Sequence, residues 1–501
     1  MRQVQENSKQ PVTHRGWVTA ALLLTMFMTA IEVTIVATAM PRIVADLGGF
    51  AHMSWVFSAY LLTQVVSIPI YGKLADTFGR KPVFLIGVAF FLAASTLCGR
   101  ATTMTELIVY RFLQGIGGGA VQPIAVTITG DLYSPRERPR VQGLFGSVFA
   151  VSSITGPMLG ALIVDLGHWS WIFYLNIPLG IVACIVLAIF LHEKKAEGKP
   201  AIDYGGAVLL ICGCSALMLV LLQGGTAWSW LGWQNIALLS AFALCCWLII
   251  LWESRVKQPI LPLWIFKHRL IVVAGIATFL NGALLIGYTA TIPTHVQGVL
   301  GESALVAGIA LGVMSIGWPL ASFAAGYVMR LTSFRKTVIL GAFTVFIGAV
   351  AMAQGAHVSA LAIGFAVFVT GLGLGLQSSS YMITIQSAVS WSERGVATAN
   401  NLFMRTLGSS VGVAAFGAIL NSTVYRYLAK GATSAKGKTV LDLVNKLLDP
   451  QNQDLTSLDR TRVIEGLNAG MTMVFLFAAL IALGNCVLAF RLPSTVRVHE
   501  E

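Results

Sequence analysis

Charged side chains are scarce in this 501-residue chain: Asp, Glu, Lys and Arg make up 11% of it, while hydrophobic residues make up 56%. Soluble domains carry about 25% charged and about 45–50% apolar residues. With so few charged side chains, the surface of a soluble globule could not be covered. The composition therefore excludes the roughly two to four soluble domains that the length alone would suggest, and it predicts an integral membrane protein.

Cysteine is scarce as well, and all seven cysteines lie within apolar segments. None has Cys-x-x-Cys spacing or a nearby histidine, which argues against a disulfide framework and against a metal site. The chain also lacks the glycine-rich loop of nucleotide-binding proteins and the catalytic triads of hydrolases. We therefore expect no catalytic residues, no metal and no other cofactor, and the protein is predicted not to be an enzyme.

The charges that are present give a net charge of +12 and lie in short clusters between apolar segments. Basic loops of this kind are typical of the cytoplasmic side of a membrane protein, so no nucleic-acid partner is expected. The opposite orientation would put the basic clusters Lys73–Lys81 and Arg136–Arg140 outside the cell. Both termini are therefore predicted to be cytoplasmic.

Fourteen apolar segments are long enough to cross a bilayer, which takes about 20 helical residues. They cover residues 17–40, 54–72, 83–99, 104–129, 140–164, 171–191, 204–223, 234–252, 270–293, 303–328, 336–354, 358–385, 398–421 and 469–491. The sequence therefore predicts an all-α integral membrane fold with fourteen transmembrane helices.

One short pattern occurs in both parts of the chain. Residues 72–82 read Gly-Lys-Leu-Ala-Asp-Thr-Phe-Gly-Arg-Lys-Pro, and residues 326–336 read Gly-Tyr-Val-Met-Arg-Leu-Thr-Ser-Phe-Arg-Lys. Each would join the second and third helices of a six-helix block, which suggests a duplication and is typical of transporters. The predicted domains are an N-terminal six-helix bundle at 1–191, a linker with two extra helices at 192–269, and a C-terminal six-helix bundle at 270–501 that includes an extracellular loop at 422–468.

Two opposite charges lie inside apolar segments, and both are candidates for proton coupling. Glu32 is surrounded by Ile31, Val33 and other apolar residues. A carboxylate at such a depth must face a cavity, pair with a cation or be protonated, and burial favours proton exchange near neutral pH. Arg111 is a suitable partner at a similar depth. The alternatives are a structural pair that never titrates, or an Arg111 that only reaches toward the end of its helix.

Other polar residues within the segments permit less definite interpretations. Arg405 could be a second buried cation or a cytoplasmic anchor, and we favour the anchor. Gly156, Pro157 and Gly160 predict a kinked helix with close neighbours. Candidates for lining a substrate cavity, each more commonly a packing residue, are Gln114, Asn281, Tyr288, Trp318, Gln377, Tyr381 and Asn401.

Taken in order, these patterns resemble the major facilitator superfamily, in its fourteen-helix drug:proton antiporter branch. The segment with Gly72, Asp76, Gly79 and Arg80 matches the signature loop between helices two and three. Further matches are Arg111 with Gln114 and Gly115 in the fourth helix, Gly156-Pro157 with Gly160 in the fifth, and the segments Ile31–Val36, Trp169–Pro178 and Arg405–Gly408.

The resemblance implies two six-helix bundles that rock around a central site in the plasma membrane. It implies multidrug efflux: a monomer exports lipophilic compounds, above all cationic ones, in exchange for protons, with the proton gradient as the energy source. Glu32 and Arg111 would then couple protons, and Gly156, Pro157 and Gly160 would belong to the antiporter-motif helix. Gly72, Asp76, Gly79 and Arg80 would form a conformational latch, with Asp76 near the start of a helix in the opposite half.

Two features depart from the pattern. The acid in the first helix is usually Asp, and here it is Glu32. The segment 303–328 has no acid beyond Glu302 at its edge, so dicationic cargo is not expected. Two alternatives stay open: export of an endogenous lipid, peptide or metabolite, and a membrane sensor that transports nothing.

Overall fold

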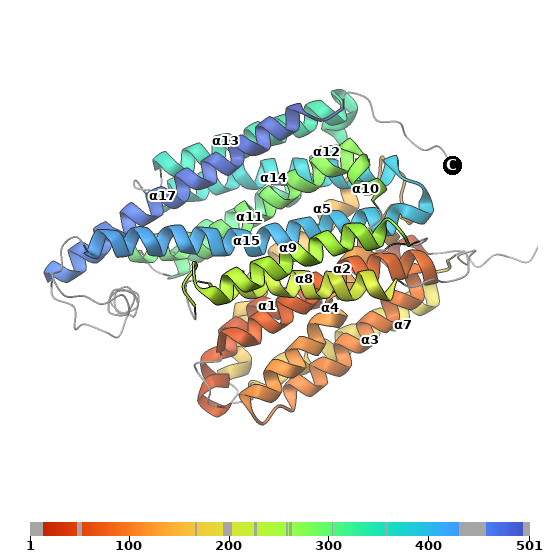
Figure 1. The fold of residues 1–501 in the computed structure, drawn as a ribbon, viewed down its shortest axis with the longest axis horizontal. Coiled ribbons are helices and arrows are strands. Elements are labelled where there is room, and N and C mark those ends of the chain that lie inside the picture. The colour runs from red at the N-terminus through yellow and green to blue at the C-terminus, as the bar shows by residue number, and fades with distance from the viewer. Residues whose placement is uncertain are drawn as a thin grey trace, which may run out of the picture.

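In the computed structural model, long helices run roughly side by side and make up most of the molecule (Figure 1). The structure describes residues 14–47, 53–165, 168–193, 203–224, 228–256, 259, 263–302, 304–355, 359–429 and 457–493. The prediction of an all-α fold is confirmed for these residues.

The first helices follow the predicted segments in order: α1 (Arg15–Leu47), α2 (Met53–Phe78), α3 (Arg80–Gly99), α4 (Met104–Leu132), α5 (Arg138–Asp165), α6 (Trp171–Tyr174) and α7 (Asn176–Phe190). The extra pair is α8 (Tyr204–Gln223) and α9 (Trp233–Glu253). The remaining helices are α10 (Trp264–Lys267), α11 (Arg269–Gly298), α12 (Ala304–Leu331), α13 (Phe334–Gly355), α14 (Ala360–Ala388), the 3-10 turn η2 (Trp391–Glu393), α15 (Arg394–Ala429) and α17 (Ser457–Phe490). We call α1–α7 the N-half and α10–α17 the C-half.

Within the described residues, eleven helices are long and apolar enough to cross a membrane. The helices α4, α5 and α8 are not among them, although each covers a predicted span. In α4 the polar residues Arg111, Gln114 and Gln122 and a run of glycines lower the hydropathy of the helix, and the apolar stretch of α8 is short, Gly205–Leu217. A multi-pass helical membrane protein is therefore confirmed, while the number of fourteen spans stays a prediction.

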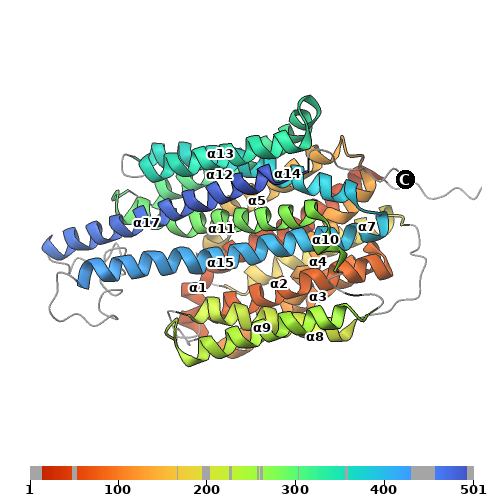
Figure 2. The ribbon, with the colours of Figure 1, turned by 45° about the horizontal axis from the view of Figure 1, so that its top comes forward.

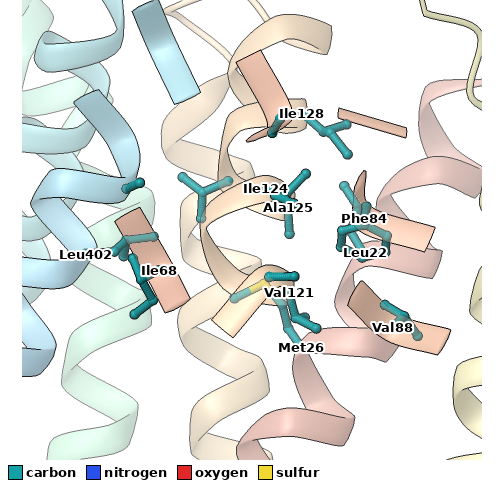
Figure 3. Close-up of a cluster of buried hydrophobic side chains, with 14 of the residues drawn as sticks. Leu22, Met26, Ile68, Phe84, Val88, Val121, Ile124, Ala125, Ile128 and Leu402 are labelled. Carbon is teal, nitrogen blue, oxygen red and sulfur yellow. The ribbon is translucent and has the colours of Figure 1, made fainter. Parts of the chain in front are cut away.

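Apolar side chains hold each half together and also join the two. Two large clusters of buried residues come from the C-half alone, and another comes from the N-half alone. The remaining large cluster crosses the boundary: it contains Leu402 of α15 together with Ile68 of α2 and Ile124 of α4, and Leu402 lies beside Ile68 (Figure 3). The positions predicted for the domain boundaries stay predictions.

The two extra helices lie side by side at the edge of the bundle (Figure 2). Leu210 and Cys214 of α8 belong to the cluster that joins the halves, and α8 packs against both α2 and α15. By contrast, α9 packs mainly on α8, and Trp233 and Trp247 are exposed. Exposed aromatic side chains of this kind suit contact with lipid.

The helices on either side extend into the segment 422–468, whose extracellular location stays a prediction. Helix α15 continues to Ala429, and α17 already begins at Ser457, so the ends of the segment are helical. A helix can continue beyond the membrane with polar side chains such as Arg426 and Arg462, whereas apolar runs mark only the membrane-spanning part. Residues 430–456 lie outside the described residues.

Candidate functional site

Glu32 and Arg111 form an ion pair between α1 and α4. Arg111 Nη1 donates to Glu32 Oε1 over 2.6 Å, and both side chains are fully buried. Arg111 also donates through Nε to the carbonyl of Val56, 3.2 Å away, and its guanidinium lies 4.2 Å from the ring centroid of Tyr60. The two opposite charges that the sequence singled out therefore compensate each other in the N-half.

A frame of neutral polar groups surrounds this pair. Asn176 donates from Nδ2 to Glu32 Oε2 over 2.6 Å and to Ser95 Oγ over 3.1 Å. Gln114 accepts from Arg111 Nη1 over 2.8 Å and donates to Ser95 Oγ over 3.1 Å. The frame holds both charged groups in one orientation. Neither Ser95 nor Asn176 is among the predicted site residues, although Asn176 lies within the segment Trp169–Pro178.

Glycines of α4 make this arrangement possible. A side chain at Gly115 would collide with the backbone of Tyr60 and with Thr63, and one at Gly118 would reach the Tyr60 hydroxyl. Without side chains there, α2 packs directly on α4, and Thr63 Oγ1 donates to the carbonyl of Phe112 over 2.8 Å. This close packing brings the ring of Tyr60 under the guanidinium of Arg111.

Asp76 connects the halves at the end of the molecule where α2 ends and α3 begins. Its carboxylate accepts hydrogen bonds from the backbone N–H groups of Gly395 (3.1 Å) and Val396 (2.7 Å). Both belong to the first turn of α15, where unpaired N–H groups and the positive end of the helix dipole favour an anion. Gly72, one turn earlier on α2, lies so close to Ala399 and Gly395 that a side chain would not fit.

Arg80 extends the same contact across the boundary. Its Nη2 lies 2.9 Å from Asp76 Oδ1 and donates to the carbonyl of Trp391 over 2.8 Å. Its Nε lies 3.3 Å from Asp131 Oδ2, and Asp131 Oδ1 lies 3.5 Å from Nη1 of Arg394. The guanidinium also lies 3.9 Å from the ring centroid of Trp391. We call the group Asp76, Arg80, Asp131 and Arg394 the latch cluster, and its end of the molecule the latch end.

The turn before Arg80 depends on a glycine and on two charged side chains, each of which binds backbone groups at the end of the other's helix. Gly79 has φ +97°, a conformation that L side chains rarely adopt. Glu193, beyond the end of α7, accepts from the backbone N–H groups of Arg80 (2.7 Å) and Lys81 (2.9 Å) at the start of α3. Lys81 in turn donates from Nζ to the carbonyls of Ala188 and Leu191. Glu193 is not among the predicted site residues.

Further hydrogen bonds join the halves near the latch end. Arg138 Nη1 donates to Ser387 Oγ over 3.2 Å, and Gln386 Nε2 donates to the carbonyl of Val126 over 3.2 Å. Pro139 of α5 also lies against Gly326 of α12. These contacts hold the halves together at that end in this conformation.

The residues predicted to form the antiporter motif lie on α5, which is helical throughout Arg138–Asp165. A side chain at Gly156 would collide with Thr34 of α1, and Thr34 Oγ1 lies 3.3 Å from the carbonyl of Ser152. Gly160 is buried, and Pro157 lies between these two glycines in the helix. The segment thus allows α5 to approach the helix that carries Glu32.

The candidate cavity residues do not converge on one place among the described residues. Asn281 donates to Gln377 Oε1 over 2.9 Å, and Asn485 Nδ2 bonds to both, so these three amides form a buried cluster that we call the amide triad. Asn401 bonds to Thr278. Tyr288 and Tyr381 are enclosed in apolar clusters of the C-half. Trp318 lies against Gly146 of α5, and Gln114 belongs to the frame around Glu32.

Comparison with known families decides the classification. The family model of the Major Facilitator Superfamily matches residues 22–413. The chain belongs to the major facilitator superfamily.

Relatives in this superfamily include proteins named for drug transport. Multidrug resistance protein 3 of Bacillus subtilis (strain 168) is 36% identical over 495 residues, which cover 97% of this chain and 96% of the relative. The multidrug transporter protein MdtP of the same organism is 36% identical over 402 residues, covering 80% and 74%. The human organic anion transporter MFSD10 has a similar crystal structure, with a TM-score of 0.63 at 14% identity over 95% of this chain and 99% of that one.

The classification establishes the coarse function. This superfamily member is a multidrug-type transporter with a multi-pass membrane setting and small-molecule substrates, and it is not an enzyme. Fold likeness to MFSD10 supports the major facilitator architecture alone, because the identity is low. The roles predicted for Glu32, Arg111 and the latch residues stay predictions, although the structure brings each group into contact.

Proposed function

We propose that this transporter exports lipophilic compounds in exchange for protons by alternating access between its halves. The observation that carries the proposal is the fully buried carboxylate of Glu32 beside Arg111. An ionisable pair inside a membrane protein marks an ion or proton pathway by default, because its burial is costly. No cofactor is needed, since a potential of 100 mV supplies about 2.3 kcal/mol for each inward charge.

Protonation of Glu32 would change the contacts of its neighbours. A neutral carboxyl no longer compensates the positive charge of Arg111, so the guanidinium would depend more on its hydrogen bonds to Gln114 and to the carbonyl of Val56. The position of α1 relative to α4 would then depend on the proton, and a movement of α1 would press on α5, because Gly156 lies against Thr34 of α1. Return of the proton to the cytoplasm restores the ion pair and completes the exchange.

The latch cluster supports the second part of the proposal, in which one end opens as the other closes. Asp76 binds the start of α15 only while the halves are together at the latch end. We assign this end to the cytoplasm, with both termini on that side of the plasma membrane, and we propose that one chain works as a monomer. In this conformation the cytoplasmic path is closed.

The proposed cargo is lipophilic and cationic. Glu32 lies deep within a predicted span, whereas Asp76 and Asp131 lie near helix ends. A single deep acid favours compounds with one positive charge, and competition between cargo and proton for it would couple the two movements. The names of the Bacillus relatives support drugs as cargo, without specifying their charge.

Ethidium efflux in inside-out vesicles tests the proposal, with and without a protonophore. We expect wild-type transport to stop with the protonophore, and Glu32→Gln to lose uphill transport at least about tenfold. The matched control is Glu302→Gln, which changes an exposed acid. Uphill transport by Glu32→Gln at the wild-type rate would refute the coupling role. A folded wild-type protein that moves no ethidium would favour an endogenous lipid, peptide or metabolite as cargo.

A further inference from the structure

Arg405 is a charged residue deep in the C-half that the proposed mechanism leaves without a role. It lies about eleven residues, or roughly 16 Å, beyond the start of α15 at Arg394. This depth corrects the expectation of an anchor at the end of the helix. The side chain is half-buried, and its guanidinium makes no hydrogen bond or ion pair with another described residue.

The direction of Arg405 follows from its neighbours on the helix. Position 405 is four residues after Asn401 and three after Leu402, so its side chain leaves α15 between the directions of those two. Asn401 donates to Thr278 of α11 over 3.1 Å. Leu402 packs toward Ile68 of α2 (Figure 3). Arg405 therefore points between α11 and the N-half.

The packing around α15 agrees with this direction. Ser409, one turn further on, donates to the carbonyl of Gly282 on α11 over 3.2 Å, and the Arg405 carbonyl lies against Gly282 itself. Helices α2, α8 and α17 also pack on α15. The exposed part of Arg405 therefore faces the space between the halves rather than lipid.

The two deep arginines differ in their charge balance. Arg111 is compensated by Glu32 at 2.6 Å, and this pair carries no net charge while the acid is ionised. Arg405 has no acid beside it within the described residues. An arginine does not shed its proton and carries five N–H donors, so it requires an anion or water at such a depth. The uncompensated charge between the halves is therefore positive.

We propose that Arg405 binds the carboxylate of transported compounds. This inference rests on the proposed function and refines its cargo to lipophilic zwitterions, in which the basic group is recognised as before and the carboxylate pairs with the guanidinium. Arginine suits the task because its planar fork can donate two parallel hydrogen bonds to one carboxylate. A neutral ester in the same place can accept one hydrogen bond but brings no negative charge to compensate the guanidinium.

Two fluorescent dyes with the same cationic ring system isolate the carboxylate. Rhodamine 110 carries a free carboxylate, and rhodamine 123 is its methyl ester. Binding is measured by fluorescence anisotropy on the purified full-length protein. We expect the wild type to bind rhodamine 110 more tightly than rhodamine 123. Arg405→Gln is expected to weaken the binding of rhodamine 110 at least about tenfold and that of rhodamine 123 less than about twofold. Arg405→Lys should keep part of the preference for rhodamine 110.

Arg426→Gln serves as the control, since Arg426 is an exposed arginine on the same helix. An equal loss of affinity for both dyes in Arg405→Gln would show that Arg405 has a merely structural role, and it would overturn the proposal. So would a wild type without preference for the carboxylate dye, a result that does not depend on the folding of any variant. Export is measured separately: a preserved binding preference without proton-driven dye export would refute the proposed function and leave the carboxylate site standing.

Discussion

Replacing Asp76 by Asn should shift the protein toward the conformation that is open at the latch end. The Asp76 carboxylate is 5% exposed and accepts two backbone hydrogen bonds from α15. A hydrogen bond to a charged group contributes about 1.5–3 kcal/mol. The amide of Asn keeps one oxygen acceptor, turns an NH2 group toward the other N–H and removes the charge from the helix start. Arg80 retains Asp131 as a partner.

The substitution therefore destabilises the closed conformation by about 2 kcal/mol relative to the open one, because the open conformation lacks these hydrogen bonds. It corresponds to a shift of about 30-fold in the equilibrium, since about 1.4 kcal/mol is tenfold. Spin labels at the exposed positions Arg136 and Thr332, one on each half, would report it by double electron–electron resonance. We expect a second, longer distance in Asp76→Asn but not in Asp46→Asn, an acid at the far end of α1. An unchanged distance distribution would refute the reasoning.

Two further substitutions test close packing and the amide triad. Gly72→Leu would place a side chain against Ala399 and the backbone of Gly395. The latch end should then fail to close, and efflux should fall at least about tenfold. Gly16→Leu, at a position with open space around it, is the control, and normal efflux by Gly72→Leu would contradict the close packing. Asn485→Leu would leave Oδ1 of Asn281 without the donor it has in the triad, while Gln377 Oε1 would keep only Asn281 as a donor, at a cost of about 1–3 kcal/mol. Its apparent melting temperature in detergent should fall, and an unchanged value would argue against a stabilising triad.

The sequence allowed the helical fold and the main charged pair to be predicted, because both leave a strong signal. A long apolar run has few alternatives to a membrane helix. Glu32 and Arg111 are opposite charges at similar depth, and each needs compensation, so their pairing was the natural expectation. The latch residues could be predicted in the same way only through the family resemblance, since Asp76 and its partner Val396 are far apart in the chain.

Other features could not be predicted, because the polarity of a residue does not show which way its side chain points or which group it contacts. Asn281 and Gln377 were candidates for a cavity, and they bond to each other and to Asn485 instead. Asn176 holds Glu32, but a lone asparagine at a helix start has many common roles. For Arg405, depth in an apolar run did not reveal that the side chain points between the halves.

The hydrogen bonds that Glu193 accepts from the start of α3, and that Lys81 donates to the end of α7, limit where this chain can be cut and rejoined. Glu193 is three residues beyond the end of α7, at the start of the connection to the extra helices, yet it binds the first turn of α3. A shortened version that removes α8 and α9 must therefore keep the chain through residue 193. A junction placed directly after Phe190 would release the turn at Gly79 and, with it, the arginine that joins the two halves.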